Sequence, residues 1–297
     1  MRKILFILLL AISALPALSQ VKDTVKHWQK GVFLSLAFNQ VSLTNWMKGG
    51  ENALSGTALT TFFANYTGKK MSWENNMTMA YGLMKTEGNP LQKNEDKIDL
   101  NSKFGHVAYK TLFYSVLLNF KSQFANGYKY PNDSVVVSKF MAPAYLTIAI
   151  GFDYKPFDFL SFFISPATGR FTFVLDQVMA DKGSYGVDKA VYDSSGTVRL
   201  KAGKKVRPEF GAYFTAKFQK DVFKFMNISS KVDLFNNFTN KVAANRKYVA
   251  VNWETMINIK AGKFITTSIF THLIYDHDVS TRVQFKEVLG VGFSYKF

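Results

Sequence analysis

Apolar side chains recur at every second position along most of the chain, and this period of two restricts the fold more than any other feature. In the segment from 249 to 260, the mostly apolar positions are Val249, Val251, Trp253, Thr255, Ile257 and Ile259. The alternate, mostly polar positions are Ala250, Asn252, Glu254, Met256, Asn258 and Lys260. Because successive side chains of a strand point to opposite faces of a sheet, the pattern predicts an all-β fold.

The length of the alternating segments indicates where their apolar faces go. Strands of soluble sandwiches usually run about 5 to 6 residues, whereas these run about 10 to 15, the length of a tilted strand that crosses a bilayer. Counting between turn signals predicts twelve strands, at residues 31–43, 53–67, 71–84, 96–109, 111–125, 140–154, 159–174, 206–219, 223–235, 248–260, 263–275 and 282–297. The predicted fold is therefore a transmembrane antiparallel β-barrel of about 12 strands.

The connections between the predicted strands alternate in length. Short connections are expected at 68–70, near 110, and at 155–158, 220–222 and 261–262. Long connections are expected at 44–52, 85–95, 126–139, 175–205, 236–247 and 276–281. Short turns on one side, long loops on the other and an even number of strands are typical of a bacterial outer-membrane barrel. The short turns and both termini are then expected on the periplasmic side.

Aromatic residues gather near the short connections. The chain has 29 Phe and 14 Tyr, more than a soluble core needs. The rings near the short turns are Tyr66, Trp73, Tyr109, Tyr154, Phe157, Phe159, Phe218, Phe223, Phe225 and Phe264. Such a band is typical of a membrane–water interface, so we interpret it as a periplasmic girdle rather than as an ordinary core.

The beginning of the chain, MRKILFILLLAISALPALSQ, has two cations, an apolar run and small residues before Gln20. This pattern predicts a signal peptide at 1–19 and export, followed by a periplasmic segment at 20–30 and the barrel at 31–297. No other apolar run of roughly 20 residues predicts a membrane-spanning helix. The sequence contains no cysteine, which excludes a lipid-anchored lipoprotein, disulfides and thiolate metal sites.

The chain ends on VLGVGFSYKF, in which Leu289, Val291, Phe293, Tyr295 and Phe297 alternate with small or polar residues. We interpret this as the last strand, with its apolar face toward lipid. The aromatic end resembles that of outer-membrane barrels, and the resemblance implies that Phe297 is the signal read by the barrel-insertion machinery.

The formal net charge is +16, or +14 once Arg2 and Lys3 leave with the signal peptide. Nucleic-acid binding is disfavoured, because the cations lie among strands and loops without a basic helix or an aromatic platform. The expected partners are outer-membrane lipid, the phosphate-rich lipopolysaccharide surface and other envelope proteins. No cofactor is expected.

Charged residues also occupy positions expected to face the lumen, the interior space of the barrel. They are Glu74, Asp99, Lys103, Lys121, Asp153, Glu209, Lys217, Lys231, Asp233, Glu254 and Lys260. Since both signs are mixed, these side chains would either brace the interior as an ion-pair network or line a narrow water path.

One short motif resembles a known family. In NQVSLTNWMKGGENALSG, the matching residues are Asn45, Trp46, Gly49, Gly50, Asn52 and Ser55. This N-W-x-x-G-G pattern near the mature N-terminus is similar to that of an uncharacterised Bacteroidota outer-membrane barrel family, a domain of unknown function.

A second similar stretch is SPATGRFTFV, with Pro166, Gly169 and Arg170. The resemblance implies an architecture and a lineage, without an activity. The motif is either a hairpin connection with an interface Trp or a partner contact.

The long connection 175–205 is a second candidate site. Its segment VYDSSGTVRL predicts a small hairpin turning at Ser195–Gly196, and Lys201, Lys204 and Lys205 are candidate contacts for anions or partners.

Catalysis is disfavoured, because Ser268 and His272 share a strand face but lie roughly 13 Å apart, and the 276–278 cluster lacks a complete metal-ligand set. A narrow pore for small solutes, anionic ones included, is the preferred function. The alternative is a non-conducting scaffold in an envelope complex, and an enzyme is disfavoured.

Overall fold

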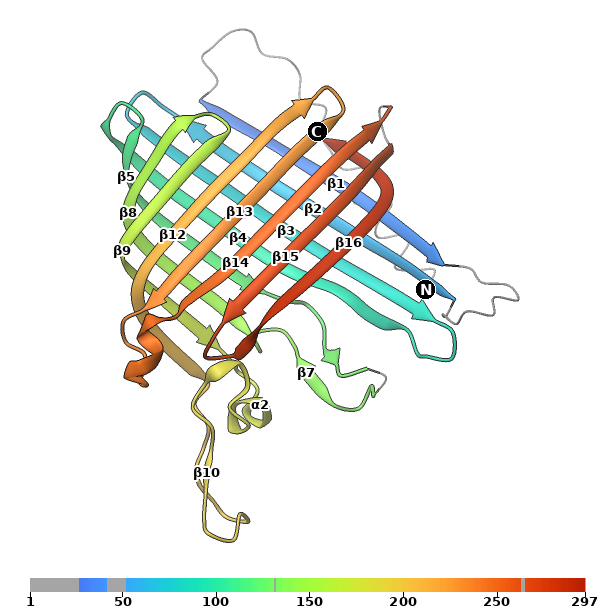
Figure 1. Ribbon diagram of the computed structural model, residues 1–297, viewed down its shortest axis with the longest axis vertical. Helices are drawn as coiled ribbons and strands as arrows, with labels where there is room; N and C mark the ends of the chain where they lie inside the picture. Colours follow the sequence, from blue (N-terminus) through green and yellow to red (C-terminus); the bar gives the residue numbers. More distant parts are fainter. Residues whose placement is uncertain (1–26, 42–51, 131, 263–264, 297) are drawn as a thin grey trace.

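Twelve long strands close into one antiparallel barrel (Figure 1) in the computed structural model, which describes residues 27–41, 52–130, 132–262 and 265–296. The barrel strands are β1 (Trp28–Val41), β2 (Ala53–Thr67), β3 (Met71–Thr86), β4 (Gln92–Tyr109), β5 (Leu112–Ser122), β8 (Ala144–Phe157), β9 (Leu160–Phe173), β12 (Val206–Phe223), β13 (Met226–Asn237), β14 (Val249–Ala261), β15 (Ile265–Asp276) and β16 (Ser280–Lys296). Each strand pairs with its neighbour along the chain, and β16 pairs with β1 to close the barrel. The predicted fold class and strand number are confirmed.

Several strand ends differ from the prediction. β8 continues to Phe157 and β12 to Phe223, so most of the connections predicted at 155–158 and 220–222 are strand. Register shifts near both ends insert extra residues while the ladder continues, which periodicity alone does not reveal. β1 begins at Trp28, three residues before the predicted start of the barrel.

The barrel is apolar on the outside and polar inside. In β8, Ile148, Ile150 and Phe152 are exposed, while Asp153, the next position, is buried. The last strand repeats the pattern, since Leu289, Val291 and Phe293 are each more than half exposed. This is the reverse of a soluble sandwich and matches the predicted lipid-facing alternation.

The two ends of the barrel differ in their connections. Short turns join strands at one end, including Asp158–Phe159 and Lys224–Phe225. The other end, which we call the long-loop end, carries the hairpin β6 (Gly127–Tyr128) with β7 (Val136–Ser138) and the hairpin β10 (Val191–Tyr192) with β11 (Arg199–Lys201). It also carries α2 (Gln177–Asp181) and the 3₁₀ turns η1 (Ser184–Gly186) and η2 (Ala243–Lys247). The hairpin predicted around Ser195–Gly196 is therefore confirmed. Among the described helices, none is long and apolar enough to cross a membrane.

A bulge in β9 explains the SPATGRFTFV segment. Ser165 is buried, Pro166 and Ala167 are both exposed, and Thr168 is buried, so the inward-facing positions change parity here. The Ser165 hydroxyl donates to the Ile150 carbonyl at 2.8 Å, and the Thr168 hydroxyl donates to Ser165 at 2.8 Å. The extra residue turns the Arg170 side chain toward the interior, where periodicity without a bulge would place it outside.

Candidate functional site

The mid-height of the lumen is crossed by an ion pair. Lys97 of β4 and Glu254 of β14 lie with Nζ and Oε2 2.9 Å apart. In the closed strand order, five strands separate β4 from β14 in either direction, so the two residues belong to opposite walls. Their direct contact therefore spans the interior of the barrel.

Further charges surround this pair. Glu254 Oε1 lies 3.7 Å from Lys121 Nζ and 3.7 Å from His272 Nε2. Asp99 lies 3.6 Å from Lys97 and 3.8 Å from Lys121, and it accepts a hydrogen bond from Asn119. Four lysine and carboxylate side chains from β4, β5 and β14 therefore form one connected group, which we call the central network.

The wall beside the central network contains a second paired group. Lys231 Nζ lies 3.1 Å from Asp233 Oδ2, and the Tyr213 hydroxyl donates to Asp233 Oδ1 at 2.6 Å. Asn252 Nδ2 donates to the same carboxylate and its Oδ1 contacts His272 Nε2 at 2.7 Å. The His272 ring is thus held between Asn252 and Glu254. Ser268 bonds instead to Asn258, so the serine and histidine have separate partners.

A charged layer lies nearer the short-turn end. Lys103 Nζ is 2.8 Å from Asp153 Oδ2 and 3.6 Å from Glu74 Oε2. Lys155 lies 3.5 Å from Asp153 and also pairs with Glu74. The Asp153 side chain is 1% exposed, so both lysines compensate a carboxylate that is nearly removed from water.

A third charged layer lies at the long-loop end. Arg170 donates through Nε and a terminal nitrogen to both oxygens of Glu209, at 2.8 and 2.9 Å, and Arg207 approaches the same carboxylate at 2.6 Å. Arg170 also contacts Asp276 at 3.1 Å, and Arg207 contacts Asp278 at 3.4 Å. The two aspartates that could have held a cation thus bind arginines.

His277, which lies between them in sequence, stacks on Tyr248 with ring centroids 3.8 Å apart. Among the described residues, no group of three or more His, Asp or Glu side chains has the arrangement of a metal site.

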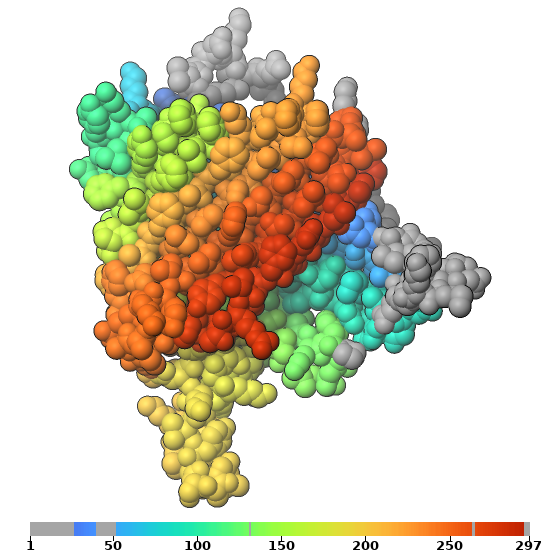
Figure 2. All heavy atoms as spheres, in the orientation of Figure 1, coloured from blue at the N-terminus to red at the C-terminus, as the bar shows by residue number. Residues whose placement is uncertain are grey.

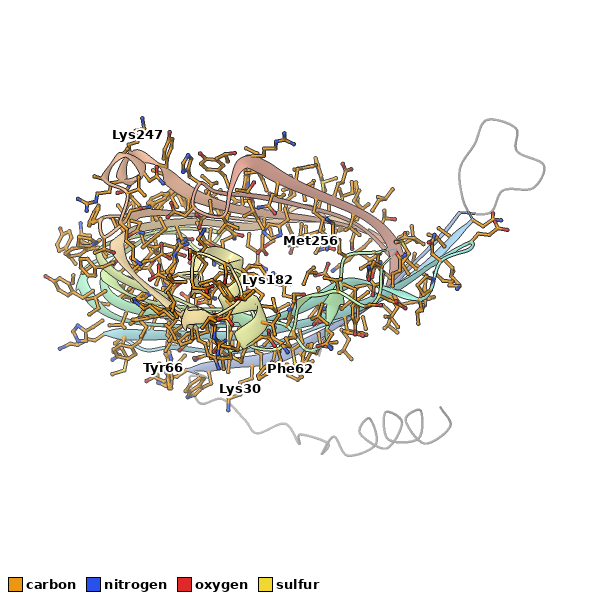
Figure 3. The ribbon with its side chains drawn as sticks, turned by 90° about the horizontal axis from the view of Figure 1, so that it is seen from below. Lys30, Phe62, Tyr66, Lys182, Lys247 and Met256 are labelled. Carbon is orange, nitrogen blue, oxygen red and sulfur yellow. The ribbon has the colours of Figure 1, made fainter. Side chains whose placement is uncertain are left out.

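A capping segment, residues 174–190, lies across part of the barrel mouth at the long-loop end, where Lys182 is labelled in Figure 3. Its small core is buried: Ala142, Val174, Met179, Ala180 and Val187, with Tyr185 packed against them. Asp176 accepts from the Met179 amide at 2.8 Å and begins α2. Lys139 pairs with Asp176 and holds the pKa of this carboxyl below its ordinary value.

Three predicted loop contacts have different surroundings. Lys201 is exposed on β11, and Lys205 supplies its carbonyl to the Val174 amide at 2.7 Å. Lys204 lies 3.2 Å from Asp188, so its charge is partly compensated, and its role as a contact for anions or partners stays a prediction. The residues Asn45, Trp46, Gly49 and Gly50, and also Phe297, lie outside the described residues.

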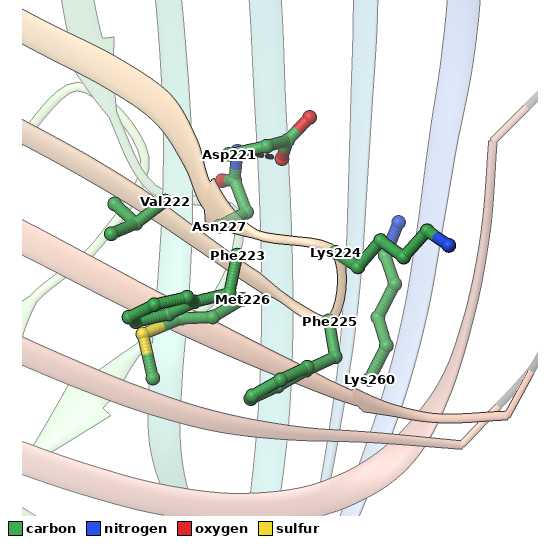
Figure 4. A pocket seen from close by; sticks show the side chains of 8 residues that line it. All are labelled: Asp221, Val222, Phe223, Lys224, Phe225, Met226, Asn227 and Lys260. Atoms are coloured by element: carbon green, nitrogen blue, oxygen red, sulfur yellow. Dashed lines mark hydrogen bonds between the residues drawn. The ribbon is translucent and has the colours of Figure 1, made fainter.

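The remaining predicted lumen residues lie toward the short-turn end. Lys217 is half-buried on β12, opposite Lys231 of β13 in the register. Lys260 is exposed beside a cavity of about 390 Å³ at the β12–β13 turn (Figure 4). Asn227 donates to Asp221 at 2.8 Å there. This open cavity lies at the short-turn rim.

Aromatic rings follow the short-turn rim as predicted. The rings of Phe157 and Phe159 stack with centroids 5.1 Å apart, and those of Phe223 and Phe225 stack at 5.8 Å. The Lys220 ammonium lies 4.3 Å from the Phe159 centroid. Phe264 lies outside the described residues.

Sequence reasoning missed Lys97, Lys155, Arg170 and Arg207, which carry much of the interior network. The two-residue period of the strands could have found Lys97 and Lys155. Each lies two positions from an aspartate predicted to face the lumen, Asp99 or Asp153. Arg170 was hidden by the bulge, although Pro166 within a strand is a signal for one.

The comparisons with known proteins agree with the fold and leave the function open. A family model described as "Protein of unknown function (DUF3078)" matches residues 38–128, from β1 to the start of the β6–β7 hairpin. No curated protein matches the chain.

Among solved structures, the chain is similar to an outer-membrane channel from Pseudomonas putida F1, with 8% identity, TM-score 0.41, and coverage of 93% of this chain and 99% of that one. It is also similar to the translocator domain of the autotransporter NalP from Neisseria meningitidis, with 9% identity, TM-score 0.39, and coverage of 100% and 96%. The NanC porin matches with 8% identity, TM-score 0.35, and coverage of 89% and 97%. At these identities and TM-scores, none of the three carries an argument about activity.

Proposed function

We propose that this chain is a bacterial outer-membrane barrel whose lumen is closed to solutes at rest, and that it serves as a scaffold or partner in a cell-envelope complex. The observation that carries the proposal is the 2.9 Å contact between Lys97 and Glu254 on opposite walls. A solute cannot pass along that line unless the two charges separate.

The membrane location is supported by the barrel exterior. Ile150 and Phe293 are 61% and 59% exposed, an arrangement that costs free energy in water and is favourable in hydrocarbon. The aromatic rim at the short-turn end fits the level of the lipid headgroups. Export by a signal peptide, insertion through recognition of Phe297 and contact of the loops with lipopolysaccharide remain parts of this proposal.

The closed lumen is supported by all three charged layers together. Oppositely charged groups in a space of low dielectric attract strongly, and each carboxylate of these layers has at least one cation beside it. The favoured state of such an interior is the paired one, because an unpaired charge there would lose its partner without regaining full hydration.

A narrow pore is the second candidate, and one observation favours it. The side chains of Lys97, Lys121 and Lys231 remain 26%, 25% and 27% exposed, so water reaches the central network. Small ions, anions included, could then pass if the pairs exchange partners.

Conductance in a planar bilayer tests the two candidates. We expect the wild type to show no single-channel steps, and Glu254→Gln to show small steps, because the substitution keeps the side-chain volume and removes the charge that holds Lys97. The matched control is Glu87→Gln, since Glu87 lies in a loop and accepts a hydrogen bond from Asn52 there. Regular steps from the wild type would refute the closed lumen and leave the pore as the function.

A further inference from the structure

The hairpin β10–β11 stands apart from the barrel. In Figures 1 and 2 the yellow segment that contains it projects from the long-loop end. Val198 and Leu200 are 58% and 66% exposed, and Val191 and Tyr192 are also exposed. The apolar side chains of the barrel wall have lipid to cover them, but those of this hairpin lie beyond the wall and have no such cover.

The base of the hairpin is fixed to α2. Asp181 Oδ1 accepts from the Gly203 amide at 2.7 Å, and its Oδ2 pairs with Arg199 at 2.5 Å. The Asp181 carbonyl also accepts from the Ala190 amide at 3.0 Å. Both ends of the hairpin are therefore attached to one residue of the capping segment.

The tip of the hairpin is also ordered by local bonds. Asp193 Oδ1 accepts from the amides of Thr197 and Val198, both at 3.0 Å. Gly196 has a φ of +74°, which a side chain would oppose. A preformed arm loses little conformational entropy on binding a partner, so its exposed side chains can contribute fully.

The acidic residues around the hairpin are all used internally. Asp176 pairs with Lys139, Asp188 with Lys204 and Lys241, and Asp181 and Asp193 bind as described above. Within the described part of the chain, no ion pair involves four lysines of this region: Lys182, Lys189, Lys201 and Lys205. The surface that remains for a partner is consequently apolar and basic.

We propose that the β10–β11 hairpin is a docking arm for a protein partner that presents an acidic strand with alternating apolar residues. A two-stranded ribbon has free backbone donors and acceptors along its edges, which an added strand can pair with. Carboxylates of that strand would lie near Lys201 and its neighbours, and its apolar side chains would cover Leu200 and Val198. A sugar–phosphate surface could use the lysines but would leave these apolar groups uncovered. The arm deepens the proposed scaffold function, and it rests on that proposal for its role in an envelope complex.

A defined peptide tests the arm on the full-length protein in lipid nanodiscs. The probe is a fluorescent peptide of alternating Glu and Val, and its binding is measured by anisotropy against a Lys–Val peptide of equal length. We expect the acidic peptide to bind and the basic one not to bind. Leu200→Ser and Lys201→Glu should each weaken binding at least fivefold, and raised salt should weaken it further.

The matched control is Lys129→Glu, which changes the same charge on an exposed lysine of the β6–β7 hairpin. Unchanged affinity in both arm variants would overturn the proposal, as would binding of purified lipopolysaccharide to the arm in place of the peptide. Conductance is recorded on the same preparations. A conducting protein that binds the peptide would refute the closed lumen alone, and a closed protein that does not bind it would refute the arm alone.

Discussion

The two ends of this barrel have similar kinds of residues and use them differently. At the short-turn end, exposed lysines such as Lys110 and Lys220 lie over aromatic rings at the rim. At the long-loop end, Arg170 and Arg207 are bound by Glu209, Asp276 and Asp278.

The difference lies in the side chains that surround the basic residues at each end. At the short-turn end, the Lys220 ammonium lies 4.3 Å from the centroid of the Phe159 ring. At the long-loop end, Asp276 is the last residue of β15, and its carboxylate lies 3.1 Å from Arg170 of β9, four strands away in the barrel order. Basic residues therefore lie over aromatic rings at one end and belong to a network of arginines and carboxylates at the other.

The largest expected effect concerns which end is outside the cell. An epitope tag inserted at Ser195 should be reached by antibody on intact cells, because the hairpin projects from the long-loop end. A tag at Lys69, in a short turn, should be reached only after the outer membrane is permeabilised. Detection of Lys69 and not Ser195 on intact cells would invert the topology.

A second prediction tests whether the long-loop network stabilises the fold. Glu209→Ala leaves two arginines without their shared carboxylate, which is 1% exposed, and should cost about 3–5 kcal/mol. Unfolding by urea in liposomes measures the loss. Glu87→Ala, in an exposed loop, should change stability by no more than about 0.5 kcal/mol. Equal losses in the two variants would show that the network contributes nothing particular.

A third prediction tests the wall between the two ends. Ile148→Arg places a charge on the outer face and should cost about 2–4 kcal/mol if that position lies near the bilayer midplane. Asn258→Arg, on the interior face of β14, should cost much less. A refolding titration in liposomes compares them, and a larger loss for Asn258→Arg would reverse the assignment of faces.

The smallest expected effect is the response of the docking arm to acid. The Gly203 amide holds the pKa of Asp181 below its ordinary value. Because the folded pKa is depressed, the contribution of Asp181 is complete above the ordinary aspartate pKa of about 3.9 and is lost as the pH falls through the lower folded value. Hydrogen exchange at the Gly203 amide should stay slow at pH 5 and accelerate below about pH 4, relative to other amides. In Asp181→Asn this pH step should disappear, and its persistence would contradict the assignment.

Much of the fold could be predicted because its signals are local. The alternation in VAVNWETMINIK assigns faces without knowledge of any partner strand, and Gly196 in its polar segment indicates a turn. The charges that face the interior could be predicted where the two-residue alternation of the strand is uninterrupted, as at Glu74 and Asp153. Arg170 was not, because one bulge in β9 changes every later position of that strand.

By itself, the sequence determined the strand number and the apolar exterior, because each depends on residues close together along the chain. The connection predicted to be long at 276–281 is instead a turn at 277–279, because strand pairing continues to Asp276 and resumes at Ser280. Only the tertiary structure decided which charges meet. Lys97 and Glu254 are 157 residues apart and come from opposite walls, so their contact exists only once the last strand has paired with the first. The tertiary structure also decides that Asp188 pairs with Lys241, 53 residues away along the chain. In the described part of the chain, Lys182, Lys189, Lys201 and Lys205 are left outside any ion pair.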